Sequence, residues 1–574
     1  MRAPPRSRCI TVVAEGAIAA LLAALLAAPS TRRAGAQPRP ERPPDLVLVG
    51  GRIFTADSAR PWAQALAVRG DRVVAVGTSA AVRRLAGPTT RRIDLGGRVV
   101  VPGFNDAHAH LACDLPRRVE FSTAAAAGDP AFATVLDSLR RITARVPEGA
   151  WIATSIGNAV LDDTAARRTA LDAVAPRHLV ALGVPTGHDV VYNTAALRRL
   201  GVSDSARDPA GGWFERDPAT GALTGRASEY ALWDVARTLN DASPERTAID
   251  ALRTAGATLL RYGVTSVQDM ANCLDPARTL RAFRAAALPL RVRVVPMPMT
   301  TATRSTTEWD AVRVDGGPAA RLRVSGVKWI LDGTPVDRGA LQRGPYADRP
   351  GWYGRADFPP DTVRAMLAEA RRRGEQPIFH AVGDSTVALL LTFMEQTGDT
   401  AGWRHLRVRF EHGEGLAPDL LERARRLGVV VVQNPAHLAI PGLSARYAPA
   451  VLADFQPLRS LLAHGVVLAL GSDGPLNPFL NILLATEDRN NPAESLTREQ
   501  AVVAYTRGSA YAEGAERVKG TLAPGMLADL AVLSQDIFTV PPGALPATTS
   551  VLTMVGGRVV RDALRPAPAS PPRR

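Results

Sequence analysis

The chain has 574 residues, enough for two to four domains of ordinary size. Hydrophobic residues make up 46% and charged residues 22%, which excludes extensive disorder and favours a sizeable core. The formal net charge is +14, but all except two of the 69 basic residues are arginine. No basic run contains interleaved aromatic residues, so we predict no nucleic-acid partner. The three cysteines, Cys9, Cys113 and Cys273, are too few for a disulfide framework or a cysteine zinc site.

The first residues have the pattern of an export signal. Three arginines precede an apolar run over 10–28, and Ala34-Gly35-Ala36 forms a small-residue cleavage site. We therefore predict a signal peptide over 1–36 and a periplasmic or extracellular protein. An uncleaved membrane anchor is the alternative, but the uninterrupted apolar part, 17–28, is shorter than the ~20 residues that span a bilayer. No other stretch is apolar enough to cross a membrane, so we expect no membrane span after cleavage.

Both ends of the remaining chain carry short apolar runs separated by glycine turns, which is typical of β-hairpins. The four residues Val49-Gly50-Gly51-Arg52 recur as Val555-Gly556-Gly557-Arg558. Neither end alone buries much apolar surface, so we predict one composite β-sandwich built from both chain ends. Two separate small sheets are the alternative.

An alternating α/β pattern lies between the two ends. Its eight apolar runs, separated by helical stretches such as 361–373 and 418–427, predict a (β/α)₈ barrel of the TIM type. About 150 residues separate the first two runs, which is too long for a simple crossover, so we predict an insertion that caps the barrel mouth. The eight predicted strands are 101–107, 263–269, 290–296, 323–331, 377–380, 407–411, 428–433 and 466–470.

The predicted parts of the chain are a signal peptide (1–36), a linker (37–44), the β-sandwich (45–101 and 519–565), the barrel (102–518, with the insertion 114–250) and a disordered tail (566–574).

The candidate chemistry lies at the ends of these strands, where the active sites of such barrels are built. His108 and His110 are two residues apart on a strand, so both imidazoles face one side and can reach one cation. Lys328 interrupts a strongly apolar run, although lysine is among the residues that are least often buried. A neutral lysine amine reacts with CO₂ to form a carbamate, which is a bidentate anionic metal ligand. A salt bridge from Lys328 to Asp332 is the alternative.

Three further strands end in residues that suit a metal site. His380 ends the fifth predicted strand, His412 follows the sixth and Asp473 follows the eighth. Since the carboxyl ends of barrel strands meet at one face, we expect these residues to converge with His108, His110 and Lys328.

These motifs resemble the amidohydrolase superfamily and, within it, amidohydrolase family 3, the YtcJ-like metal-dependent hydrolases. The resemblance covers about residues 45–562 and is carried by the following segments: Pro102 to His110, Gly263 to Asp269, Val327 to Gly333, His380 to Asp384, Glu411-His412, Tyr505-Thr506 and Gly520 to Leu530. Asn105 and the 432–437 segment depart from the family pattern, and both lie outside the expected ligand positions.

The resemblance implies a site with one or two divalent metal ions, zinc first and manganese, iron or nickel as alternatives. His108 and His110 would hold one ion and His380 and His412 the other. Lys328, carboxylated by CO₂, would bridge them, and Asp473 would be both ligand and general base. We predict attack by a metal-activated hydroxide, with Asp473 returning the proton to the leaving nitrogen.

Three residues are candidates for substrate binding. His188 and Glu229 lie in segments of the insertion that are similar to the family pattern, and His437 follows the seventh strand. The alternative is structural: His188 would hold the insertion together and His437 would contact a loop backbone.

The predicted function is an exported amidohydrolase that cleaves a non-peptide carbon–nitrogen bond, of the amide or formamide type, in a small molecule. A lactonase or phosphoester hydrolase with the same metal site is one alternative, because the ligands do not encode the leaving group. A non-catalytic secreted binding protein is another. The sequence leaves open whether the protein is a homo-oligomer.

Overall fold

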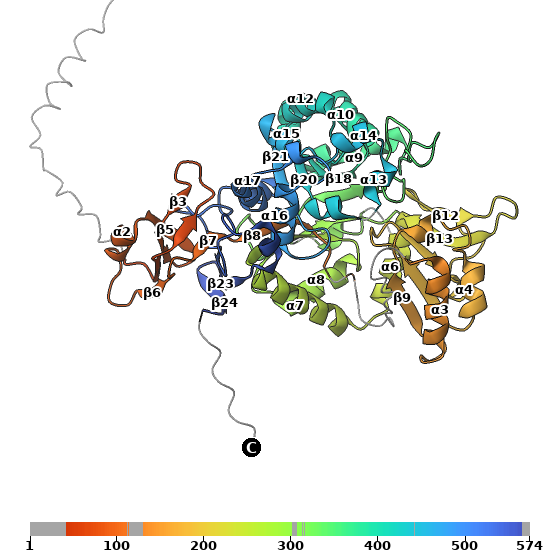
Figure 1. The fold of residues 1–574 in the computed structure, drawn as a ribbon, viewed down its shortest axis with the longest axis horizontal. Helices are drawn as coiled ribbons and strands as arrows, with labels where there is room; N and C mark the ends of the chain where they lie inside the picture. The colour runs from red at the N-terminus through yellow and green to blue at the C-terminus, as the bar shows by residue number, and fades with distance from the viewer. Residues whose placement is uncertain are drawn as a thin grey trace, which may run out of the picture. The chain divides into compact units, whose positions relative to one another are not determined.

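A computed structural model describes residues 42–111, 113, 130–300, 307–312, 314, 316–440 and 442–564 (Figure 1). The predicted signal peptide (1–36), most of the predicted linker (37–44), the predicted tail (566–574) and residues 114–129 of the insertion lie outside these residues. Within the described part of the chain, we find no helix with the length and apolar character of a membrane span.

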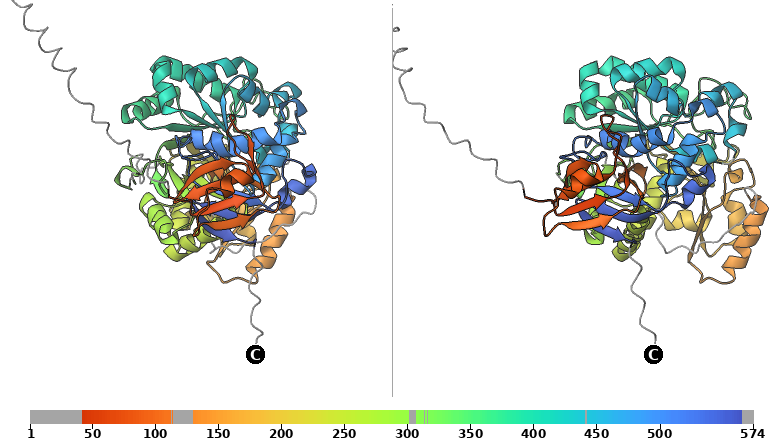
Figure 2. Two further views of the ribbon diagram at one scale, coloured as in Figure 1. Left: turned by 90° about the vertical axis from the view of Figure 1, so that its left-hand side faces the viewer. Right: turned by 60° about the vertical axis from the view of Figure 1, so that its left-hand side comes forward.

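One sheet contains strands from both chain ends (Figure 2). Its strand order is β24-β23-β22-β7-β2-β3, and β7 from the N-terminal part pairs antiparallel with β22 from the C-terminal part, with Val100 opposite Val532. The strands are β2 (Arg52–Phe54), β3 (Trp62–Ala63), β7 (Val99–Pro102), β22 (Leu530–Leu533), β23 (Ser550–Val555) and β24 (Arg558–Asp562).

A second sheet of the N-terminal part has the order β5-β4-β1-β6. Leu48 and Leu66 of this sheet share one buried apolar cluster with Val100 and Leu530 of the first, so the two sheets contact each other through their apolar faces. Its elements are β1 (Leu46–Val49), β4 (Ala65–Arg69), β5 (Arg72–Gly77), β6 (Arg91–Asp94) and the short helix α2 (Ser79–Arg83).

Two parallel sheets form the central region, with orders β16-β15-β14-β8 and β17-β18-β19-β20-β21. Each of the eight strand ranges predicted from the sequence overlaps a parallel strand, and the fourth is divided in two at Gly326, whose φ of 76° interrupts the extended backbone. The strands are β8 (Phe104–Ala109), β14 (Val264–Ala271), β15 (Arg291–Pro296), β16 (Leu322–Val324), β17 (Val327–Ile330), β18 (Pro377–Ala381), β19 (Arg409–His412), β20 (Val430–Gln433) and β21 (Val467–Leu470).

Helices follow most of these strands. In both α9 and α12 a proline occupies the first turn, and a left-handed glycine, Gly374 or Gly428, ends the helix. The helices of this region are α7 (Glu245–Arg261), α8 (Pro276–Ala286), α9 (Pro360–Arg373), α10 (Asp384–Thr397), α11 (Thr400–Leu406), α12 (Pro418–Leu427), α13 (Leu443–Arg446), α14 (Pro449–Ala453), α15 (Leu458–Ala463), α16 (Pro478–Thr486), α17 (Arg498–Val503) and α18 (Ser509–Ala512).

The long segment between β8 and β14 folds around its own five-stranded sheet, drawn in orange and yellow in Figure 1, with the order β12-β13-β11-β10-β9. Its elements are α3 (Phe132–Thr143), β9 (Trp151–Ser155), α4 (Arg168–Val174), β10 (Leu179–Gly183), β11 (Asp189–Tyr192), α5 (Thr194–Arg199), β12 (Gly212–Arg216), β13 (Leu223–Glu229) and α6 (Tyr230–Asp241).

Candidate metal centre

The six residues predicted as metal ligands lie at the carboxyl ends of the parallel strands. His108 is in β8 and His110 follows it, Lys328 is in β17, His380 in β18 and His412 at the end of β19, and Asp473 follows β21. Five of them line a cavity of about 930 Å³, and the sixth, His108, is fully buried directly behind it. The folded chain therefore brings together residues that are up to 365 positions apart.

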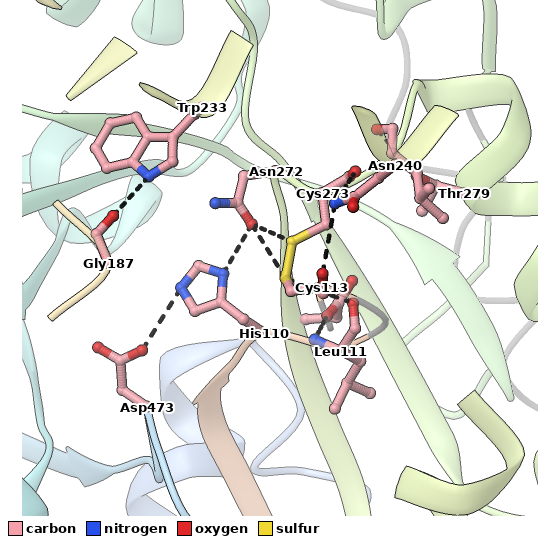
Figure 3. Close-up of a disulfide and its surroundings, with 12 residues drawn as sticks. His110, Leu111, Cys113, Gly187, Trp233, Asn240, Asn272, Cys273, Thr279 and Asp473 are labelled. Carbon is pink, nitrogen blue, oxygen red and sulfur yellow. Dashed lines mark hydrogen bonds and ion pairs between the residues drawn. A yellow bond between two sulfur atoms is a disulfide. The ribbon is translucent and has the colours of Figure 1, made fainter. Parts of the chain in front are cut away.

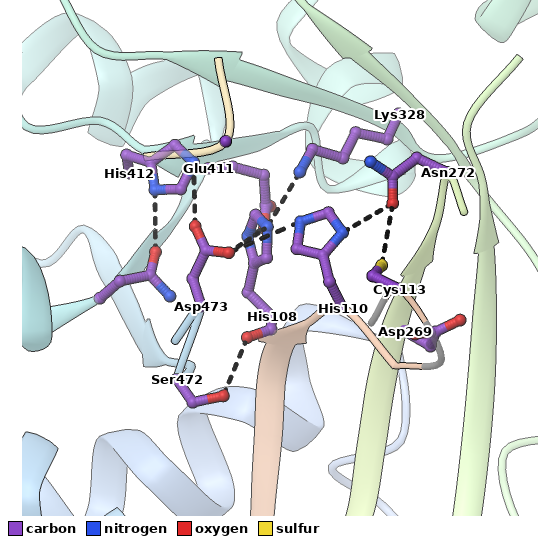
Figure 4. A network of polar contacts seen from close by, with 12 residues as sticks. His108, His110, Cys113, Asp269, Asn272, Lys328, Glu411, His412, Ser472 and Asp473 are labelled. Carbon is purple, nitrogen blue, oxygen red and sulfur yellow. Dashed lines mark hydrogen bonds and ion pairs between the residues drawn. The ribbon is translucent and has the colours of Figure 1, made fainter. Parts of the chain in front are cut away.

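The Asp473 carboxylate lies at the centre of this group (Figure 4). Its Oδ1 is 3.5 Å from Nε2 of His110 and 3.8 Å from Nε2 of His108, and its Oδ2 is 3.8 Å from Nε2 of His412. Potential ligand atoms of His108, His412 and Asp473 all lie within 4.8 Å of one another. Lys328 Nζ is 2.9 Å from Nε2 of His108, so the lysine reaches the same place.

Three of the four imidazoles are oriented by an oxygen atom at Nδ1. The partner is Glu411 for His108, at 2.6 Å, and Asn434 for His412, at 2.9 Å. For His110 it is Asn272, also at 2.9 Å. Each contact places the proton on Nδ1 and leaves the Nε2 lone pair facing Asp473. This arrangement is the usual one around metal-binding histidines.

His380 completes the group. Its ring centroid is 4.4 Å from that of His412, and its Nε2 is buried without a hydrogen-bond partner among the described residues. A buried nitrogen of this kind is costly unless something binds it. The residues present therefore fit a divalent cation, because they supply neutral nitrogen donors and a carboxylate within reach of one another.

The electrostatics of the group favour the metal-binding protonation states. Burial lowers the pKa of all four imidazoles, that of His110 to about 3, so they are neutral at pH 7. Burial also lowers the pKa of Lys328 to about 8. For Asp473, burial alone would raise the pKa, but the adjoining histidines, His108 and His437 foremost, hold it well below its usual range.

Two of these residues occupy strained backbone positions. His412 has a φ of 69° and Asp473 a φ of 38°, both in the left-handed region that side chains other than glycine rarely adopt. Such conformations persist only where the surrounding structure holds them, and they are common at functional sites. A φ of 54° at Glu229 is a third example, at the junction of β13 and α6.

The three candidate substrate-binding residues occupy different layers of the cavity wall. His188 and His437 line the cavity. Glu229 lies behind His188, with both carboxylate oxygens 2.9 Å from His188 Nδ1, so it reaches the cavity through that ring. Since Glu229 holds His188 Nδ1, the other ring nitrogen is free to meet a ligand. The ring centroids of His188 and His380 are 5.0 Å apart.

His437 has a different character. Its Nδ1 is 2.7 Å from Glu414 Oε1 and its Nε2 is 3.5 Å from Asp473 Oδ2. Burial alone would lower its pKa, but these two carboxylates raise it to about 10. His437 is therefore a cation beside Asp473, and its two N–H groups face Glu414 and Asp473.

Several residues of the site were not predicted as part of it. Glu411 accepts a hydrogen bond from Nε of Arg409 at 2.8 Å, and it also holds His108. Asn272, Asn434 and Glu414 carry no sequence signal that separates them from ordinary loop residues. The three cysteines are too few for a disulfide framework, but the structure joins Cys113 and Cys273 in a single disulfide across 160 positions.

The Arg409–Glu411 pair gives a stability prediction. Both side chains are fully buried, and Arg409 also donates to the Ala107 carbonyl at 2.9 Å. Arg409→Met would leave the Glu411 charge buried and unpaired, which we expect to lower the free energy of unfolding by about 3–5 kcal/mol. Arg425→Met is the matched control, because Arg425 pairs with Glu422 at an exposed site and should cost less than about 1 kcal/mol. Denaturant unfolding of the two variants checks this, and equal losses would contradict it.

The sequence comparison decides the family. The model of the amidohydrolase family matches residues 91–561, which is most of the chain. The chain belongs to the amidohydrolase family. The amidohydrolase is therefore a metal-dependent hydrolase of carbon–nitrogen bonds other than peptide bonds, and the family and enzyme class predicted from its motifs are confirmed.

Three curated relatives are similar to this amidohydrolase over nearly their whole length. Protein LONG AFTER FAR-RED 3 of Arabidopsis thaliana is 28% identical and covers 90% of this chain and 91% of its own. Putative amidohydrolase YtcJ of Bacillus subtilis is 26% identical, and the match covers 89% of this chain and 98% of that protein. N-substituted formamide deformylase of Arthrobacter pascens is 27% identical, and the match covers 89% of this chain and 97% of that protein.

The fold of this amidohydrolase is similar to the folds of several solved structures. An uncharacterized metal-dependent hydrolase of Pyrococcus horikoshii has a TM-score of 0.66 and 23% identity, with 87% of this chain and 99% of that chain covered. A second one, from Pyrococcus furiosus, has a TM-score of 0.65 at the same identity, with 86% and 100% covered. The predicted α/β class is thereby confirmed.

Proposed function

We propose that this amidohydrolase is an exported enzyme that cleaves an amide or formamide-type bond of a small, uncharged molecule. The observation that carries the proposal is the convergence of six side chains from the ends of five strands, with three Nε2 atoms directed at Asp473. The formamide type is supported by the similarity to N-substituted formamide deformylase over 89% of the chain.

In this proposal His108 and His110 would hold one divalent ion, His380 and His412 would hold a second, and zinc is the first candidate. Asp473 would be a ligand of the first ion. Lys328, which is buried and lies beside His108, would be a ligand of both as a carbamate formed from its neutral amine and CO₂ with release of a proton. Bound cations would polarise the substrate carbonyl and make water acidic enough to attack near neutral pH.

The chain's own residues supply the remaining chemistry. Asp473 accepts a proton from the attacking water on a carboxylate oxygen and then delivers it to the leaving nitrogen. Glu411, Asn272 and Asn434 keep the ligand rings in one tautomer and orientation. His188 and His437 contact the substrate, and Glu229 orients His188.

The cavity wall favours an uncharged substrate. Among the described residues that line it, Lys328 is the only lysine and none is an arginine, although arginine is abundant elsewhere in the chain. The described lining therefore offers no guanidinium for bidentate recognition of a phosphate or carboxylate, and recognition of an anionic group would depend on the bound cations and His437. This composition favours an amide over the phosphoester alternative.

We also propose a domain organisation. The two central parallel sheets are the two parts of the (β/α)₈ barrel (102–518), with β16 and β17 as one interrupted strand and the insertion (114–250) forming one side of the cavity. The two sheets that contain the chain ends form the composite β-sandwich (45–101 and 519–565). The shared apolar cluster between those two sheets supports this arrangement.

Export is supported by one structural observation besides the N-terminal pattern. A disulfide such as Cys113–Cys273 persists in oxidising compartments and is rare in the cytosol. Export is tested by amino-terminal sequencing of the protein recovered from the periplasm or the medium, where we expect a mature chain that begins at Gln37. Retention of residues 1–36 in an exported protein would contradict signal cleavage.

The function is tested with purified protein produced with ample zinc or manganese. We expect one to two equivalents of metal per chain, and turnover of neutral N-substituted formamides or amides that is lost on chelation and restored by the metal. Protein that folds and contains almost no metal would contradict the catalytic proposal. Faster turnover of lactones or phosphoesters than of every amide tested would favour the alternative chemistry.

A further inference from the structure

The end of β14 and the loop after it hold the end of β8 and the residues that follow it at three places. The Asp269 carboxylate accepts a hydrogen bond from the Leu111 amide at 2.7 Å, and Asn272 Oδ1 is 2.9 Å from Nδ1 of His110. Cys273 is joined to Cys113 by the disulfide. The proposed ligand His110 is therefore held at its ring by Asn272, and the chain directly after it is held at Leu111 and Cys113 (Figure 3).

The Asn272 side chain packs directly against the disulfide. Its Oδ1 lies 3.0 Å from Cys273 Sγ and 3.8 Å from Cys113 Sγ. Sulfur atoms in a disulfide carry no proton, so these two contacts are not hydrogen bonds, and the proton that this oxygen accepts comes from His110. The bridge thus limits where the amide can move and does not compete with His110 for it.

The insertion is attached at the same place. Asn240 of α6 donates through Nδ2 to the carbonyl oxygens of Cys273, at 3.1 Å, and Cys113, at 3.4 Å. The same helix carries Trp233, which lines the cavity and donates to the Gly187 carbonyl at 3.2 Å. The disulfide is therefore the point where β8, β14 and the insertion helix meet.

We propose that Asn272 is a positioning residue for His110 and that the Cys113–Cys273 disulfide keeps Asn272 and the end of β8 in register. We call this arrangement the His110 brace, and it consists of Asn272, Cys113 and Cys273. It rests on the proposed function only in treating His110 as a metal ligand. Without the brace, the His110 ring can take the other tautomer and turn its Nε2 away from Asp473.

The brace is tested by metal affinity, measured in competition with a chromophoric chelator using zinc alone. We expect Asn272→Ala to bind zinc about 10–100-fold more weakly than the parent, as is typical when a histidine ligand loses its partner. Asn272→Asp keeps an acceptor oxygen and should restore most of the affinity. Cys113→Ala/Cys273→Ala should weaken binding in the same direction, and Asn490→Ala, at an exposed loop position, should leave it unchanged.

A double-mutant cycle separates positioning from general stability. If Asn272 acts through His110, then Asn272→Ala should have almost no further effect on zinc affinity in a His110→Ala background. Asn272, Cys113 and Cys273 themselves line the cavity, so turnover is measured at saturating zinc, where a positioning role predicts a lower kcat and a direct substrate contact would instead raise KM. Mass spectrometry of the intact and reduced, alkylated parent should show one disulfide.

The outcomes distinguish the two proposals. A parent protein that binds no zinc refutes the proposed function. If Asn272→Ala and the cysteine double variant both bind zinc as tightly as the parent, the brace is refuted and the proposed function is not. Losses from His110→Ala and Asn272→Ala that simply add would also refute it, because they would show that Asn272 contributes independently of His110.

Discussion

Asp473→Asn should lower kcat by about 10²–10⁴-fold, the range expected when a general base is removed. The substitution keeps the size of the side chain and one carbonyl oxygen, but it removes the group that accepts the proton from water. Asp473 is ionised in the folded protein, since its pKa is held well below its usual range, so the loss should extend across the neutral pH range. Steady-state kinetics on a neutral formamide, with metal content measured in parallel, checks this.

Asp454→Asn is the matched control, because Asp454 is exposed and lies outside the cavity lining. Its kcat should equal that of the parent. If Asp473→Asn retains its metal and its kcat stays within about tenfold of the parent, another residue moves the proton and the assignment of Asp473 is wrong.

Lys328→Ala should remove the bridge between the two proposed ions and abolish detectable turnover. Loss of a histidine's supporting partner already costs about 10–100-fold in metal affinity, and a direct ligand should cost at least as much. We expect less metal per chain in this variant, and faster metal loading of the metal-free parent when bicarbonate is added. Isotopically labelled bicarbonate should give a carbamate carbon signal in the parent that Lys328→Ala lacks.

The chain provides a matched control for this substitution. Lys519 is the other lysine and is also buried, and its Nζ is 2.7 Å from Glu513 and 2.8 Å from Ser266. Lys519→Ala removes a buried lysine of similar environment away from the cavity, so it should lower stability but leave the metal content unchanged. A Lys328→Ala protein that keeps both ions and full turnover would contradict the carbamate bridge.

The central strands could be predicted because parallel strands covered on both sides are continuous apolar runs. The same pattern located the candidate ligands, since a polar residue directly after such a run lies at the carboxyl edge of the sheet. The division of the fourth strand at Gly326 could not be predicted, because a single glycine in an apolar run does not show that its φ will be positive.

The supporting residues of the site could not be predicted for a different reason. Asn272 and Asn434 follow strands that neighbour those of His110 and His412, whereas Glu411 of β19 reaches His108 of β8 in the other parallel sheet. These contacts exist only once the strands are arranged, so no local sequence pattern shows them. The Cys113–Cys273 pairing depends on two loops that meet only after β8 and β14 have paired. Lone cysteines 160 positions apart carry no spacing signal for such a pairing.

Both lysines of this arginine-rich chain are buried, Lys328 with 1% and Lys519 with 4% of its surface exposed. The outer surface of the described residues consequently presents no lysine amine, and Lys328 is reached only from inside the cavity that it lines. Bulky amine-directed dyes and supports should therefore find no lysine to attach to on that surface. Lysine-directed cross-linkers will be poor reporters of self-association, and proteases that cut after lysine should find no accessible bond until the chain unfolds.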